Sequence, residues 1–135
     1  MSIGDVAEAT GLGIHALRFF EREEIFLRPI PRTSGGQRVY DASDVEWLLL
    51  CNRLRESGMP IATLKKFAHL VRSGPGNERE RLTLLENHES TVQRRIAELT
   101  ASLEIIHGKV ETYRKHVENG TAVGVWEPAR PGRPD

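Results

Sequence analysis

Arginine is concentrated in one short stretch near the beginning of this chain. The stretch between His15 and Tyr40 contains no lysine and five arginines, Arg18, Arg22, Arg28, Arg32 and Arg38. A guanidinium group presents fixed N–H donors that match the oxygens of a phosphate. Three nearby glutamates offset part of this charge, and the whole chain has a formal net charge of zero. The stretch therefore predicts a local anion-binding surface on a chain that is not basic throughout.

Residues that ligate metals or act as nucleophiles are sparse. The single cysteine, Cys51, excludes an internal disulfide and an all-cysteine metal site. The five histidines include no pair at the i, i+4 spacing that brings two ligands together on a helix. We therefore expect no metal and no cofactor. Since no glycine-rich phosphate loop follows a strand and no Ser/His/Asp or paired-carboxylate arrangement stands out, we do not expect an enzyme.

The elements that must position the arginines begin with a helix-turn-helix. Ser2 followed by Asp5 predicts a capped helix start, and Gly11 with Gly13 predicts a tight turn after that helix. A second short helix is predicted over residues 14–23. Its inward-facing residues are expected to be Ile14, Leu17 and Phe20 or Phe19.

Residues 26–40 predict a small hairpin. Two prolines near its start argue against a helix, and apolar residues stand on both sides of a tip at residues 33–36. Arg32 and Arg38 flank the tip. A basic hairpin directly after a helix-turn-helix is typical of a wing that lies along a phosphate backbone. The alternative is a solvated loop with incidental arginines.

Two further helices and then a long one follow. Ser43 is expected to cap a helix over residues 44–56, and a fourth helix runs from Ile61 to the break at residues 74–76. Asn77 with Glu80 predicts the cap of a long helix.

The long helix carries an apolar seam. Between Leu82 and Val117, apolar residues recur at alternating steps of three and four, the period of a coiled coil. The residues expected to mediate dimerisation are Leu82, Leu85, Val92, Ile96, Leu99, Leu103, Ile106 and Val110. A helix of this length spans about 54 Å at about 1.5 Å per residue, which a chain of this size does not cover by itself. We therefore expect a second copy to cover the seam.

Together these patterns predict a mainly α chain in three parts. A winged helix-turn-helix domain is expected at residues 1–73, a coiled-coil dimerisation helix at residues 77–118, and a short, flexible tail at residues 119–135. No apolar run approaches the roughly 20 residues of a membrane-spanning helix, and no signal segment precedes the first helix. We expect no membrane association and a cytoplasmic location.

The order of these parts resembles the MerR family of bacterial transcription regulators over residues 1 to about 118. The residues that carry the resemblance are Ile3-Gly4-Asp5-Val6-Ala7, Leu17-Arg18-Phe19-Phe20-Glu21-Arg22-Glu23, Pro29, Arg32, Arg38, Tyr40, Asp44-Val45, Leu48, Leu54-Arg55, Gly58-Met59 and Ile61. The resemblance implies an antiparallel coiled coil between two protomers. It also implies binding to an inverted-repeat operator in double-stranded promoter DNA, and a distortion of that DNA that controls its use by RNA polymerase.

The resemblance also assigns roles to single residues. It implies that Arg18 contacts a base edge or a phosphate, that Arg38 and Tyr40 hold phosphates, and that Arg32 adds a further contact. His15 and Arg22 stand at helical offsets that reach the DNA. The chain departs from the family where Phe19 and Phe20 replace two common tyrosines, so Phe19 meets the DNA without a hydroxyl group. Further departures at Gly13, Ala16 and Gln37 predict an altered operator preference.

The inducing signal is less clearly indicated by the sequence. The chain is similar to the short branch of the family, which lacks a large effector domain and responds to electrophiles, aldehydes or oxidants. Cys51 is a possible sensor thiol, but it also falls on the apolar stripe of its helix with Val45, Leu48 and Leu54, which favours packing. A small apolar ligand is a third possible signal. The alternative to a regulator is a coiled-coil adaptor or architectural protein that recruits partners without sequence-specific regulation.

Overall fold

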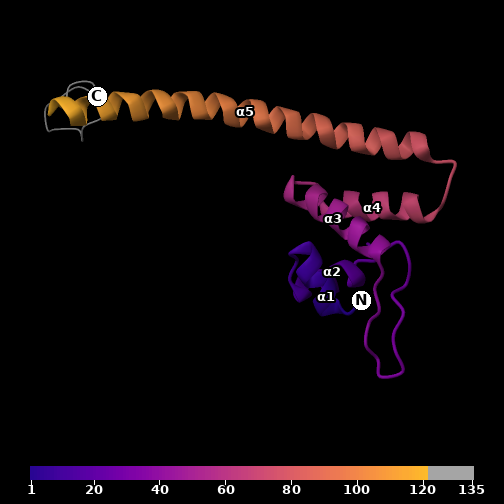
Figure 1. Ribbon diagram of the computed structural model, residues 1–135. Helices are drawn as coiled ribbons and strands as arrows, with labels where there is room; N and C mark the ends of the chain where they lie inside the picture. Colours follow the sequence, from indigo (N-terminus) through magenta and orange to yellow (C-terminus); the bar gives the residue numbers. More distant parts are fainter. Residues whose placement is uncertain (122–135) are drawn as a thin grey trace, which may run out of the picture. The chain divides into compact units, whose positions relative to one another are not determined.

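The computed structural model describes residues 1–121, and these are mainly helical with no named strand (Figure 1). The helices are α1 (Ile3–Thr10), α2 (Ile14–Arg22), α3 (Ala42–Glu56), α4 (Ile61–Arg72) and α5 (Glu78–Asn119). The chain divides into two compact units, Met1–Val92 and Gln93–Asp135. The predicted mainly α fold with an N-terminal helix-turn-helix and a long C-terminal helix is confirmed. The predicted flexible tail lies almost entirely outside the described residues.

The helix-turn-helix forms at the residues that the sequence indicates. The Ser2 hydroxyl accepts from the N–H of Asp5 while the Asp5 carboxylate accepts from the N–H of Ser2, a complete capping box. Gly11 ends α1 at φ 73°, a left-handed conformation that glycine adopts without strain. Leu17 is buried as predicted, but Ile14 is 40% exposed because it begins α2, one turn before the helix meets the core.

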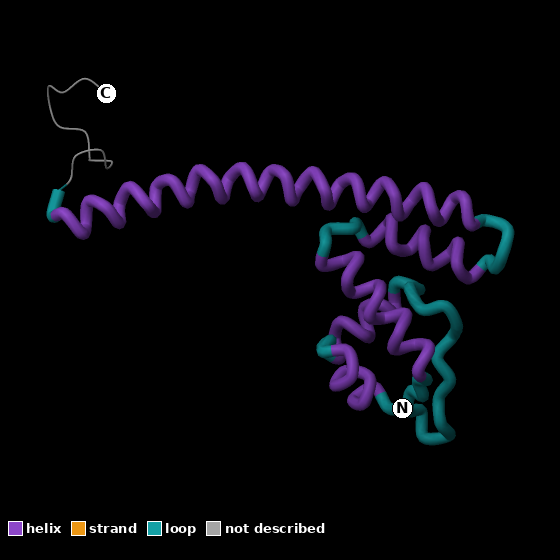
Figure 2. The backbone as a smooth tube through the Cα atoms, turned by 45° about the horizontal axis from the view of Figure 1, so that its top comes forward, coloured by secondary structure: helices purple, strands orange, loops and turns teal. Residues whose placement is uncertain are grey.

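The hairpin between α2 and α3 is held by few backbone contacts. An isolated antiparallel bridge pairs Arg32 with Arg38. On either side of it, the N–H of Thr33 donates to the carbonyl of Gln37 and the N–H of Val39 donates to the carbonyl of Pro31, both at 2.8 Å. The segment is drawn in Figure 2 as the long teal loop between the two helices. The predicted hairpin is therefore present, but it is reduced to one bridge and a turn.

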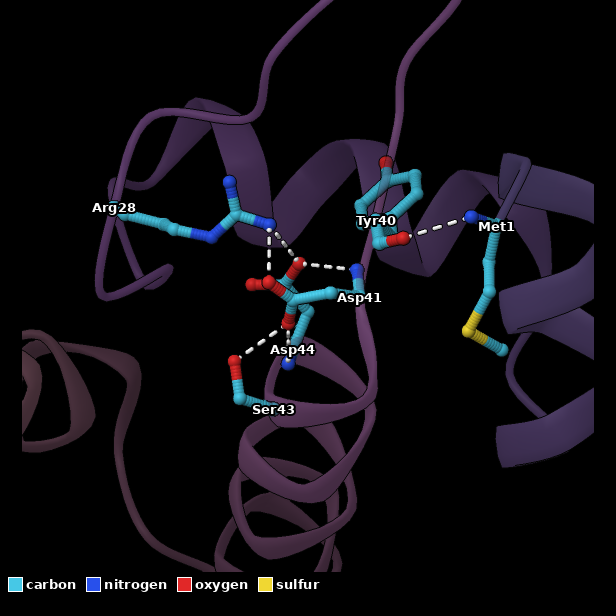
Figure 3. Close-up of polar contacts among 6 residues, drawn as sticks. All are labelled: Met1, Arg28, Tyr40, Asp41, Ser43 and Asp44. Atoms are coloured by element: carbon cyan, nitrogen blue, oxygen red, sulfur yellow. Dashed lines mark hydrogen bonds and ion pairs between the residues drawn. The ribbon is translucent and has the colours of Figure 1, made fainter.

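The start of α3 differs from the prediction. Asp41 is the N-cap in place of Ser43, and it forms a capping box with Asp44. The Asp44 carboxylate also accepts from Arg28 Nη2 at 2.6 Å, while the Ser43 hydroxyl donates to Asp41 (Figure 3). Either residue type caps well, and each has an acid three positions later, Asp44 for Asp41 and Glu46 for Ser43. The box that forms is the one whose acid also binds Arg28. Arg28 thereby fastens the entrance of the hairpin to the first turn of α3.

One core joins α1 to α4. Its fully buried members include Leu17 of α2, Leu48 of α3 and Leu64 of α4. The Trp47 ring stacks on Phe67 at 5.7 Å between centroids, and its Nε1–H donates to the carbonyl of Ile25 at 2.8 Å. The indole thus buries apolar area while its one donor is satisfied, as a buried tryptophan requires.

The connection to α5 also differs from the prediction. Asn77 does not cap α5 with its side chain, because its amide donates to the carbonyl of Leu70 and its oxygen accepts from Arg81. Arg81 itself donates to the carbonyl of Gly74 at 2.7 Å. These contacts satisfy carbonyls at the end of α4, which helical bonding leaves open. They also attach the start of α5 to α4 within the first unit.

The predicted seam of α5 is divided between two environments. Leu85 and its neighbour Leu84 are partly buried and pack against the core of the first unit. In the described part of the second unit, the large apolar side chains are exposed. They are Ile96, Leu99, Leu103, Ile105, Ile106, Val110, Tyr113 and Val117, with exposed fractions of 40–79%. Ile105 lies off the predicted period.

The burial of Cys51 predicts low thiol reactivity. The side chain is fully buried, and burial raises the pKa of the Cys51 thiol to about 12. At pH 8 about one thiol in ten thousand would then be ionised, and the thiolate is the reactive form. Iodoacetamide at pH 8 is expected to label the native protein at least a hundredfold more slowly than the protein in guanidinium chloride, as followed by intact mass. Equal rates in the two conditions would contradict this placement.

The Arg28–Asp44 contact predicts a measurable contribution to stability. Replacing Asp44 by alanine removes an acceptor from the α3 cap and leaves Arg28 without its shortest ion pair. We expect Asp44→Ala to lower the free energy of unfolding by about 2 kcal/mol, measured by urea denaturation. Glu46→Ala, an exposed change on the same helix, is the matched control and is expected to change it by less than about 0.5 kcal/mol.

Candidate nucleic-acid interface

The outward face of α2 carries a row of basic side chains. His15, Arg18 and Arg22 are all exposed, and their spacing of three and four places them along one side of the helix. Within residues 1–121, none of the three makes an ion pair or a side-chain hydrogen bond. The opposite side is fixed, because Leu17 and Phe20 are buried in the core. The helix thus presents these groups from a rigid base.

Phe19 lies between these two faces. Its ring is half-buried, packs against the core and contacts Phe20 at 6.0 Å between centroids. The structure therefore shows a packing role for Phe19, and the DNA contact that the family resemblance implies stays a prediction.

The wing arginines are joined to α2 by one carboxylate. Arg38 Nε donates to Glu21 Oε2 at 2.5 Å, and Arg32 Nη2 donates to Glu21 Oε1 at 3.4 Å. Arg38 and Glu21 are 22% and 26% exposed, whereas Arg32 is 47% exposed. Because Glu21 lies one turn after Arg18 on α2, the contact places the wing arginines beside the basic row. The structure therefore brings Arg18, Arg22, Arg32 and Arg38 into one region of the first unit.

Tyr40 differs from the predicted arrangement. Its side chain is 2% exposed, packs against Phe26 at 5.9 Å between centroids, and its hydroxyl is covered and has no partner among the described residues. Burial, and then the Glu21 carboxylate, raise the pKa of Tyr40. Its backbone is tied to Met1 by two hydrogen bonds of 2.8 Å (Figure 3 shows the one from the terminal ammonium). In this conformation the hydroxyl is not available to a phosphate, so Tyr40 supports the wing from the core.

Sequence reasoning missed three structural partners. In the sequence, Glu21 stands out only as a negative charge that offsets nearby arginines. Its position one turn after Arg18 was the feature that could have placed it beside the basic row of α2. Arg28 faces Asp41 and Asp44, so it does not belong to the anion-binding set. Arg72 of α4 donates to the carbonyls of Glu24 and Phe26 at 2.5 and 2.9 Å. Glu24 has φ 56°, and Arg72 secures this left-handed turn after α2.

Residues 1–121 contain neither a cluster of metal ligands nor a membrane-spanning helix. No group of three or more His, Cys, Asp or Glu side chains there is placed to hold a metal ion. No helix in that part of the chain combines the length and apolar character needed to cross a membrane.

Known proteins share this arrangement. Residues 1–70 match the family model described as MerR HTH family regulatory protein. A helix-turn-helix transcriptional regulator from Haemophilus influenzae is 33% identical over 125 residues, which cover 93% of this chain and 92% of that protein. The crystal structure of HiNmlR, a MerR family regulator lacking the sensor domain and bound to promoter DNA, has a TM-score of 0.84 at 30% identity. The structural alignment covers 95% of this chain and 96% of the HiNmlR chain.

A second solved structure agrees. A MerR family transcriptional regulator from Listeria monocytogenes has a TM-score of 0.81 at 26% identity, covering 89% of this chain and 90% of that one. The matched family model spans more than half of this chain, and the Haemophilus relative is aligned over nine-tenths of both proteins. The chain therefore belongs to the MerR helix-turn-helix family of transcription regulators.

Proposed function

We propose that this chain binds an inverted-repeat operator in promoter DNA as a homodimer, in the cytoplasm, and controls transcription by distorting that DNA. The observation that carries the proposal is the contact of Glu21 with Arg32 and Arg38, which joins the exposed basic row of α2 to the wing. Such a surface suits a duplex, because a helix enters the major groove while arginines beside it hold the backbone. The promoter DNA bound in the HiNmlR structure supports the same role here.

Within this proposal, the basic residues divide between base and backbone contacts. Arg18 lies at the middle of the exposed face of α2 and contacts base edges or a phosphate, with His15 and Arg22 on either side. Arg38 and Arg32 contact phosphates next to the groove. Tyr40 is left out of the contact set, because its hydroxyl is buried.

The exposed apolar side chains of α5 support a homodimer. Leucine and isoleucine residues that are 58–63% exposed, such as Ile96, Leu99 and Leu103, recur at coiled-coil spacing. A contiguous exposed apolar stripe of this kind marks an interaction surface. In the proposed antiparallel dimer, two helix-turn-helix units face two half-sites, and RNA polymerase uses the same promoter. Bending or untwisting the DNA between the half-sites costs several kcal/mol, which the backbone contacts offset.

The inducing signal is not assigned to Cys51. A buried thiol with a raised pKa is unsuited to a rapid reaction with electrophiles or oxidants. A small ligand with an apolar body has a place in the first unit. A groove of about 630 Å³ lies between α4 and the first turns of α5, with Met59, Pro60 and Leu84 as apolar lining and Lys66 and Arg79 as cations. Its size is within the range of small-molecule sites.

DNA binding is tested by a DNase I footprint on promoter DNA at several salt concentrations. The wild-type protein is expected to protect an inverted repeat with hypersensitive bands at its centre. Arg18→Ala should weaken operator binding about 5- to 150-fold, and Arg38→Ala should also reduce the slope of log Kd against log salt by about one. Arg53→Ala removes an arginine that is 84% exposed on α3 and serves as the control with unchanged protection.

The adaptor alternative would be favoured if a folded, dimeric protein neither protected promoter DNA nor selected any site from a pool of random sequences. Unchanged binding by both Arg18→Ala and Arg38→Ala would likewise remove the proposed interface.

The dimer is tested by placing a charge in the seam. Leu103→Arg is expected to shift the protein from dimer to monomer in light scattering at micromolar concentration, because an unpaired guanidinium would be buried in the interface. Ala101→Arg adds the same charge two residues earlier, away from the seam, and is expected to leave the dimer intact. A Leu103→Arg protein that remains dimeric would contradict the proposed interface.

A further inference from the structure

We infer that Glu21 is a positioning residue for DNA binding. Its carboxylate holds the guanidinium of Arg38 through Nε and thereby sets the terminal nitrogens, Nη1 and Nη2, for a phosphate. The inference rests on the proposed function, since it concerns how the wing meets DNA. Full affinity for DNA, an anion, would therefore require a negatively charged side chain in the binding surface.

Two arginines face each other across the hairpin, which is electrostatically unfavourable. The hydrogen bonds from Thr33 and Val39 flank the Arg32–Arg38 bridge on its two sides, the pattern of the closely spaced, non-hydrogen-bonded pair of an antiparallel ladder. Side chains of such a pair leave the backbone close together, and like charges placed directly opposite each other are destabilising. Glu21 offers one carboxylate oxygen to each arginine. It therefore relieves a repulsion that the wing cannot relieve alone.

Glu21 binds one particular nitrogen of the Arg38 guanidinium. The 2.5 Å contact is made to Nε, and within residues 1–121 neither Nη1 nor Nη2 of Arg38 makes a hydrogen bond. A guanidinium held at Nε keeps its outer edge of two N–H donors, which matches two oxygens of a phosphate. Arg32 differs, since its Nη1 donates to the carbonyl of Gly36 and its Nη2 makes the longer 3.4 Å contact with Glu21. Arg38 is therefore the arginine that Glu21 positions most closely.

Charge alone would predict the opposite effect of Glu21 on the affinity for DNA. A carboxylate beside a phosphate backbone repels it, so replacing Glu21 by a neutral residue should tighten DNA binding if charge alone mattered. If Glu21 positions Arg38, the same replacement should weaken binding. The sign of the change therefore separates the two accounts.

The test is a double-mutant cycle on operator DNA with Glu21→Gln and Arg38→Ala, singly and together. Glu21→Gln is expected to weaken binding about tenfold and to lower the salt slope by about one, as Arg38→Ala does. In the Arg38→Ala background, Glu21→Gln is expected to change the affinity by less than about twofold. Glu23→Gln makes the same charge change two residues later, at a side chain that pairs with Lys65 of α4, and is expected to bind as well as or better than wild type.

A conservative variant guards against a simple folding defect. Glu21→Asp keeps the charge but is one methylene shorter, so it is expected to weaken binding about as much as Glu21→Gln, with an unchanged melting temperature. Tighter or unchanged binding by Glu21→Gln, wild-type binding by Glu21→Asp, or an equal loss in the Arg38→Ala background would each overturn the inference. Failure of the wild-type protein to bind any operator, or insensitivity to Arg18→Ala, would instead refute the proposed function.

Discussion

The shared core of the first unit is the constraint on which the candidate interface depends. Leu17 and Phe20 anchor one side of α2 in that core, and Tyr40 anchors the end of the hairpin in it. The two elements that are proposed to meet DNA are therefore fixed to the same packed interior, which deforms little. Without this burial, neither the basic row of α2 nor the wing arginines would have a defined position.

Contacts with carboxylates and carbonyls divide the arginines into those that are bound within the protein and those that remain accessible to a ligand. Arg28 and Arg72 are used within the protein, where they fasten the hairpin entrance and the turn after α2. Arg38 and Arg32 are held by Glu21 but remain partly exposed, whereas Arg18 and Arg22 extend from α2. Exposed ion pairs contribute only about 0–1 kcal/mol each to stability. Their larger effect here is to fix the directions of groups that a ligand can reach.

Helix starts and stops could be predicted from the sequence, whereas side-chain partners that are distant in the sequence could not. The Ser2–Asp5 box, the Gly11 stop and the long helix α5 follow from spacing alone, and each lies where it was predicted. The use of its heptad seam for dimerisation stays a prediction. The α3 cap was misplaced because Asp41 and Ser43 are both competent, and the choice depended on Asp44 and Arg28. Likewise, the side chain of Asn77 does not cap α5 as expected, because its amide donates to the carbonyl of Leu70.

The same distinction holds in the candidate site. Exposure of His15, Arg18 and Arg22 could be predicted from the period of α2, because Leu17 and Phe20 define the opposite side. The packing of Tyr40 on Phe26 and the contact of Glu21 with Arg38 join residues that are 14 and 17 positions apart, so no local pattern contained them. The family resemblance predicts which residues meet DNA, and the structure adds the contact of Glu21 with Arg32 and Arg38.

A crystal structure of the protein bound to its operator duplex would show directly how the wing and α2 meet DNA. We expect Arg18 to lie in the major groove and Arg38 to contact a phosphate through its terminal nitrogens while its Nε remains on Glu21. A complex in which the wing lies away from the DNA, or in which Arg38 has left Glu21 to reach its phosphate, would contradict this expectation.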